Sequence, residues 1–123
     1  MTYTEKLYAS KQHYPFDRWQ KGLEFGLEQY TRENCDRARQ IFDDLIDGLN
    51  SFGADASEAD KLGRFKTAVL ALNDLNEELG ECFIETSERE DLCELFDEVC
   101  RAAGMNPTDY GDGEGPASEW RDW

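Results

Sequence analysis

Residues 57–79 read SEADKLGRFKTAVLALNDLNEEL and carry the clearest helical pattern in the sequence. Apolar side chains recur there at steps of three and four, which places them along one side of a helix. They are Leu62, Phe65, Val69, Leu72, Leu75 and Leu79, with Ala68 and Ala71 beside them. A single helix with such a stripe is unstable in water, so other parts of the chain must cover it.

Three further segments show the same period and are expected to supply that cover. The spacing predicts one helix over residues 16–30, a second that follows the cap Thr31 and ends at Gly53, and a third over residues 87–103. Ser87, with Glu90 three residues later, has the form of a capping box for the last of these. The pattern therefore predicts an all-α, single-domain helical bundle of four main helices.

The segments between and outside these helices are less regular. Residues 1–14 are expected to form a short helix or an N-terminal arm on the bundle, and the segment GECFIET, residues 80–86, either continues the central helix or crosses the end of the bundle. The acidic, aromatic tail, residues 105–123, is predicted to pack on or near the bundle. Its DYGDGEG stretch indicates a turn, and Pro116 suits the first position of a brief terminal helix.

Length and composition limit the possible classes. A chain of 123 residues suits one domain, 1–123, and has no apolar run long enough to cross a bilayer and no apolar N-terminal signal segment. We therefore expect a cytoplasmic protein. Its four cysteines form no CxxC pair and it has one histidine, which favours buried, reduced thiols and no metal or other cofactor.

The net charge of −15 is unevenly distributed along the chain. Residues 1–62 contain eight Lys and Arg against twelve Asp and Glu, whereas residues 63–123 contain five against sixteen. A surface of this sign repels nucleic-acid phosphates and anionic lipid. We therefore expect no nucleic-acid or membrane partner, and a basic protein is the natural complement.

Catalytic motifs are sparse, with one acidic exception. The spacing EExxE, twelve residues and ExxD, within residues 77–97, resembles the metal-binding motif of the all-α nucleoside triphosphate pyrophosphohydrolases of the MazG and dimeric dUTPase type. This resemblance implies Mg²⁺ ligands that bridge substrate phosphates. Those ligands would be Glu78, Glu81, Glu94 and Asp97. The alternative is that the same carboxylates form a solvated surface.

The tryptophans of the tail also allow two interpretations. Trp120 and Trp123 either fold back to close the core, which we favour, or serve as aromatic anchors of an interface.

In size, acidity and its closing ASEWRDW (residues 117–123), the chain resembles small bacterial immunity proteins of polymorphic-toxin and contact-inhibition systems. The resemblance implies a toxin inhibitor rather than an enzyme, one that binds a basic toxin domain by electrostatic capture and occludes its active site. The identity of the toxin and the oligomeric state stay open. The side chains expected to bind the partner are Glu77, Glu81, Glu88, Asp91, Glu94, Glu98, Asp112, Glu114 and Trp120.

Overall fold

A computed structural model describes all 123 residues, and the chain contains helices, short 3₁₀ turns and no strand. The α-helices are α1 (Tyr3–Ala9), α2 (Phe16–Lys21), α3 (Arg32–Phe52), α4 (Glu58–Glu78) and α5 (Thr86–Ala102). The 3₁₀ turns are η1 (Ser10–His13), η2 (Gly22–Phe25), η3 (Pro107–Asp109), η4 (Gly111–Gly113) and η5 (Pro116–Glu119). The predicted all-α fold class is confirmed.

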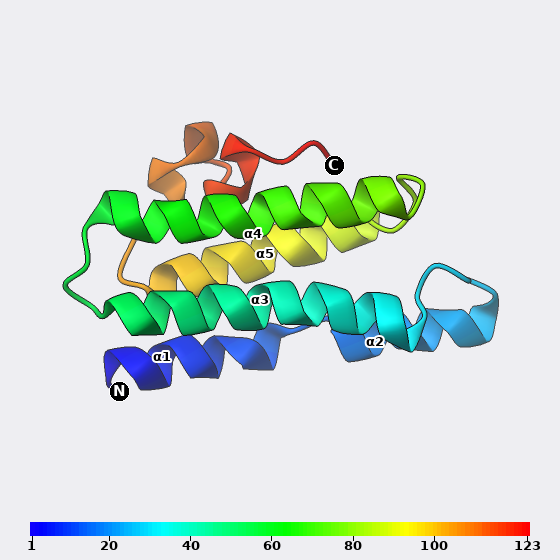
Figure 1. Cartoon of the computed structure of the whole chain (residues 1–123), viewed down its shortest axis with the longest axis horizontal. Coiled ribbons are helices and arrows are strands. Elements are labelled where there is room, and N and C mark those ends of the chain that lie inside the picture. The colour runs from blue at the N-terminus through cyan, green and yellow to red at the C-terminus, as the bar shows by residue number, and fades with distance from the viewer.

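The three long helices form the frame of the molecule. In Figure 1, α3 and α4 lie side by side and run in opposite directions, with α5 behind them, while α1 and α2 follow one another along α3. The 3₁₀ turns of the tail lie over α4 and α5. The expected bundle therefore has three long helices, with the segmented chain of α1, η1 and α2 in the fourth position.

One apolar core of 26 buried residues extends from Leu7 to Trp123. The Phe96 ring of α5 lies 4.6 Å from the Phe42 ring of α3 and 6.3 Å from the Phe65 ring of α4, centroid to centroid. All three rings are fully buried. Aromatic pairs at such distances stabilise a core beyond the area they bury, so Phe96 joins the three long helices.

Side chains cap the starts of both α3 and α4, and Thr31 is the cap that the sequence predicts for α3. The Thr31 side chain accepts a hydrogen bond from the Asn34 amide at 3.1 Å, and the Ser57 side chain accepts one from the Asp60 amide at 3.1 Å. Each bond satisfies one of the amides that a helix leaves free in its first turn. Gly53 ends α3 with a φ of +85°, a backbone conformation that residues other than glycine disfavour.

The start of α5 differs from the prediction. The helix begins at Thr86, and the Glu85 amide donates to the Glu88 carboxylate at 3.3 Å, so Ser87 and Glu90 are not its capping pair. The preceding segment is a crossover and not more helix, because Gly80 and Glu81 both have positive φ. Phe83 and Ile84, which follow them, are buried at the end of the bundle.

The predicted helix over residues 16–30 is wrong beyond Lys21. Gly22 and Gly26 weaken a helix at this point, and Gly26 adopts a φ of +86° that turns the chain. The Leu27 amide then bonds to the Gly22 carbonyl at 3.1 Å and closes a tight loop. As a result Leu23 and Leu27, which the periodicity places in the core, lie exposed.

The ends of the chain both pack on the bundle. Residues 1–14 form α1 and η1, with Leu7 fully buried, and Trp123 of the tail is buried while Trp120 is half-buried. The Asn73 side chain fixes the tail by donating to the Trp120 carbonyl at 3.0 Å and accepting from the Asp122 amide at 3.1 Å. No helix combines the length and the apolarity that crossing a bilayer requires.

The prediction of buried thiols is confirmed for Cys35 and Cys100 and is wrong for Cys82, which lies exposed in the α4–α5 turn. Cys93 is half-buried on α5. Burial raises the pKa of the Cys35 thiol to about 11 and that of the Cys100 thiol to about 12, so these two stay protonated at neutral pH.

Candidate partner-binding surface

Two of the predicted binding residues on α5 make contacts within the molecule. The Asp91 carboxylate accepts a hydrogen bond from the Trp19 indole at 2.9 Å and lies 3.0 Å from the Arg18 guanidinium. Glu98 pairs with Arg101 at 2.7 Å and lies 3.7 Å from His13. Asp91 and Glu98 therefore help to attach the N-terminal segments to α5, and their charges are partly neutralised.

Three of the other predicted acids of this region face solvent. Glu94 on the outer side of α5, Glu77 near the end of α4 and Glu81 in the following turn are exposed and have no ion-pair partner. Glu88 is half-buried and accepts the Glu85 amide at the start of α5. The predicted set thus divides between the outer side of α5 and the end of the bundle where α4 turns into α5.

The tail brings further acids to α5. Gly115 packs so closely on α5 that a Cβ atom at this position would lie 2.3 Å from the Asp97 carboxylate. Burial raises the pKa of Asp97, with Glu98 and Glu94 adding to the effect and Arg101 opposing it. We call this region the acidic ridge. It consists of Glu94 and Asp97 of α5 with Glu114 of the tail.

The tail residues of the predicted set have different environments. Asp112, at φ +54°, and Glu114 are exposed around an open hollow of about 290 Å³ that Glu119 also lines. The Glu119 carboxylate accepts from the Gly111 amide at 2.6 Å, which stabilises the loop. Trp120 is half-buried and packs against the core, so most of its ring is unavailable as an interface anchor.

The four carboxylates of the alternative metal site are not gathered in one place. Glu78 forms an ion pair with Arg37 of α3, Glu81 lies in the turn after α4, and Glu94 and Asp97 are on α5. No three His, Cys, Asp or Glu side chains anywhere in the molecule are arranged to hold a metal ion. The structure therefore offers no geometric support for the pyrophosphohydrolase reading.

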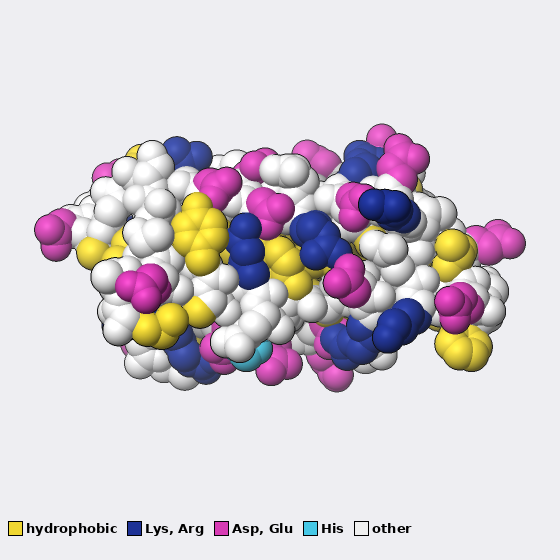
Figure 2. Space-filling view, turned by 90° about the horizontal axis from the view of Figure 1, so that it is seen from below, with side chains coloured by type: hydrophobic (Ala, Val, Ile, Leu, Met, Phe, Trp, Pro, Cys, Tyr) yellow, Lys and Arg dark blue, Asp and Glu magenta, His cyan; other side chains and the backbone are white.

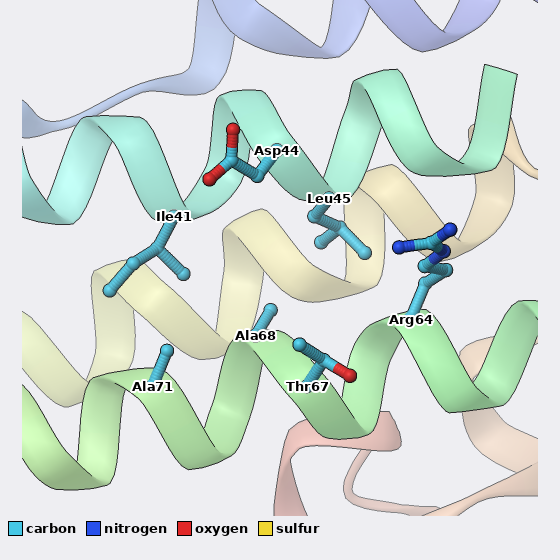
Figure 3. Close-up of a pocket in the computed structure, with 7 residues that line it drawn as sticks. All are labelled: Ile41, Asp44, Leu45, Arg64, Thr67, Ala68 and Ala71. Atoms are coloured by element: carbon cyan, nitrogen blue, oxygen red, sulfur yellow. The ribbon is translucent and has the colours of Figure 1, made fainter. Parts of the chain in front are cut away.

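A small hollow between α3 and α4 was not predicted (Figure 3). It has a volume of about 100 Å³, an apolar floor that includes Ile41 and Ala71, and a rim with Asp44 and Arg64. The Arg64 guanidinium stacks 4.7 Å from the Phe52 ring, and its Nε has no hydrogen-bond partner. Such a hollow accepts at most one small apolar side chain.

Charges of both signs alternate on the face formed by the N-terminal segments, which Figure 2 shows from below. Lys11 lies 3.2 Å from Asp43, and Arg39 lies 2.6 Å from Asp17. The Tyr8 hydroxyl donates to Asp47 at 2.7 Å. Asp17, Asp43 and Asp47 are therefore matched by donors, in contrast with Glu94 and Glu114 of the acidic ridge.

The sequence interpretation missed one exposed apolar group. Phe25 is 83 % exposed, and its neighbours Leu23 and Leu27 are 45 % and 46 % exposed, all in the loop that replaces the second half of the predicted first helix. The two glycines four residues apart, Gly22 and Gly26, are the signal that could have indicated a loop here.

Comparison with known proteins gives no identification: no protein-family model, no curated protein and no solved structure matches this chain.

Proposed function

We propose that this chain is an acidic protein-binding module, specifically an immunity protein that binds a basic toxin domain and blocks its active site. The observation that carries the proposal is the state of the acids in residues 63–123. Of the sixteen acids there, only Glu78, Asp91 and Glu98 take part in ion pairs. Most of the remaining carboxylates are exposed, and their charge is available to an external partner.

The physical mechanism has two stages. A toxin that acts on nucleic acid presents Lys and Arg side chains, and a strongly negative surface accelerates its association up to about 10⁸–10⁹ M⁻¹s⁻¹ at low salt. Affinity then depends on a few desolvated contacts and not on total charge. The acidic ridge, together with the exposed Glu77, Glu81 and Asp112, supplies the first stage in this proposal.

The test begins with the product of the reading frame immediately upstream of this gene. We expect that product to carry net positive charge, to arrest bacterial growth when expressed alone, and to be neutralised by co-expression of this chain. Stopped-flow mixing should show an association rate that falls about tenfold or more between 50 and 500 mM salt.

Charge-reversal variants give a matched control. Glu94→Lys with Glu114→Lys changes the ridge, whereas Glu33→Lys with Asp55→Lys makes the same change in net charge on the first half of the chain, where both acids are exposed. The ridge pair should slow association at least five times more than the control pair. The proposal fails if the upstream product neither arrests growth nor binds, and if no Lys/Arg-rich protein is recovered from the native host at low salt.

A further inference from the structure

The α2–α3 connection and the α4–α5 turn meet at one end of the bundle, on the right in Figure 1. The Tyr30 hydroxyl donates to the Phe83 carbonyl at 3.0 Å, and the Gln29 amide donates to the Cys82 carbonyl at 3.3 Å. Tyr30 is buried, and burial together with the nearby Glu88 carboxylate raises its pKa, so the hydroxyl stays a donor. We call residues 22–30 and 80–88 the turn end.

An apolar tip projects from the turn end. Phe25 is the most exposed large apolar side chain of the molecule, and Leu23 and Leu27 flank it. The loop that carries them is closed by the Gly26 amide bonding to the Leu23 carbonyl at 3.1 Å, and the Leu27 side chain packs against Gly22. An exposed aromatic group on a closed loop binds without a large loss of conformational entropy, as interface anchors do.

A hollow of about 180 Å³ lies beside this tip. Its lining is Arg18, Trp19, Gly22, Leu27, Tyr30, Ser87, Glu88 and Asp91. Two aromatic rings and two carboxylates thus border one cavity. Aromatic faces and carboxylates both stabilise a guanidinium or ammonium group, the former through cation–π contact and the latter through charge-assisted hydrogen bonds.

The contacts inside the hollow already show this chemistry. Asp91 accepts a hydrogen bond from Trp19 and is paired with Arg18, whose side chain is 66 % exposed, whereas Glu88 forms no ion pair. Elsewhere in the turn end, Glu24, Glu28 and Glu85 are exposed and form no ion pair, and residues 22–30 and 80–88 contain no Lys or Arg. A basic group is therefore the complement of this hollow.

We propose that the hollow receives an arginine or lysine side chain of the partner protein, while an apolar side chain of the same partner packs on Leu23 and Phe25. This inference rests on the proposed function, and it names the chemistry of the partner's contact segment: a basic residue with apolar neighbours. It also places the desolvated contacts at the turn end, with the acidic ridge left to steer the approach.

The probe is the tripeptide Ac-Leu-Arg-Leu-NH₂, compared with Ac-Leu-Cit-Leu-NH₂, in which citrulline replaces arginine with a neutral group of the same shape. Titration of the ¹⁵N-labelled full chain should give saturable shifts at the Trp19 indole and at residues 22–30, with a millimolar Kd for the arginine peptide. The citrulline peptide should bind at least fivefold more weakly.

Three variants separate the contributions of the hollow, of the apolar tip and of nonspecific charge attraction to peptide binding. Glu88→Gln retains an acceptor for the Glu85 amide and removes a carboxylate from the hollow. It should weaken the binding of the arginine peptide about fivefold. Phe25→Ala should weaken the binding of both peptides threefold or more. Glu114→Gln removes the same charge from the ridge and should change neither affinity by more than about 1.5-fold.

The inference is overturned if both peptides shift the same residues with equal affinity, if shifts spread evenly over the exposed acids, or if Glu114→Gln weakens binding as much as Glu88→Gln. Concentration-dependent sedimentation of the free chain that Phe25→Ala abolishes would also overturn it, by assigning the tip to a second copy. Because the peptides are used without any toxin, these results stand apart from the growth assay and the partner-binding tests, which decide the proposed function.

Discussion

The layer of α1, η1 and α2 on α3 and the acidic ridge, where the tail packs on α5, use the same residue types in opposite ways. In the first region, Asp43 meets the Tyr14 hydroxyl at 2.8 Å and the Lys11 ammonium at 3.2 Å. In the second, Glu94 and Glu114 meet no donor and face solvent. Carboxylates attach the N-terminal segments in one region. In the other they create a negative electrostatic potential that no neighbouring side chain neutralises.

This difference shows why total charge is a poor guide to function. A carboxylate with a half-buried partner contributes to folding, because its removal leaves a donor without an acceptor. A solvated carboxylate contributes little to folding and is free to act on a partner at a distance. The comparison therefore predicts that stability and partner binding respond to different acids.

The largest expected effect on stability comes from removing an acid that is paired with a donor. Asp43→Ala removes the acceptor of the half-buried Tyr14 hydroxyl and the ion pair with Lys11, and should lower the free energy of unfolding by about 1–3 kcal/mol. Glu94→Ala, the control on the ridge, should change it by less than about 0.5 kcal/mol. Urea denaturation followed by circular dichroism measures both. Equal losses in the two variants would show that the two regions do not differ.

The sequence predicted the long helices well because their determinants are local. Thr31, Ser57 and Gly53 mark helix ends by their own hydrogen bonds or backbone freedom, and the stripe from Phe65 to Leu75 needs only a period of 3.6 residues. The prediction failed between Lys21 and Tyr30. There the apolar spacing continues, but two glycines weaken the helix and the chain reverses.

The candidate site was less predictable, since it depends on contacts between distant segments. Asp91 and Glu94 are three residues apart and look equivalent in sequence, but only Asp91 lies beside Trp19 and Arg18. Pairing across 72 positions leaves no periodic signal. The position of Glu114 next to α5 likewise depends on Gly115 fitting against Asp97, a contact that only the folded tail makes.

A smaller effect should follow from salt. The repulsion among unmatched acids is screened as the Debye length falls from about 30 Å at 10 mM to about 3 Å at 1 M, so added salt should stabilise the chain by on the order of 1 kcal/mol. Chemical denaturation with urea at fixed NaCl concentrations measures this gain.

Neutral substitutions locate the source of that repulsion. Changing Glu90, Glu94 and Glu114 to Gln should reduce the salt-induced gain more than changing Glu24, Glu28 and Glu33 to Gln, although both variants lose three exposed carboxylates. A larger reduction in the second variant would place the uncompensated field on the N-terminal side instead.

The smallest effect concerns Asp97, where the tail covers the ridge. Burial raises its pKa above the value of about 3.9 expected in the unfolded chain, so the folded state binds the proton more tightly. This contribution stabilises the fold fully below the unfolded pKa and is lost as the pH rises through the folded pKa, leaving the charged form less stable at pH 7.

Asp97→Asn should therefore raise the free energy of unfolding at pH 7 by a few tenths of a kcal/mol, with the gain disappearing below about pH 4. Urea midpoints measured between pH 3 and pH 7 test this, with Glu94→Gln as the solvated control that shows no such pH dependence. A stability loss at pH 7 in Asp97→Asn would mean that the carboxylate holds Gly115 and the tail in place by its charge, and Asp97 would then belong with the structural acids of the opposite layer.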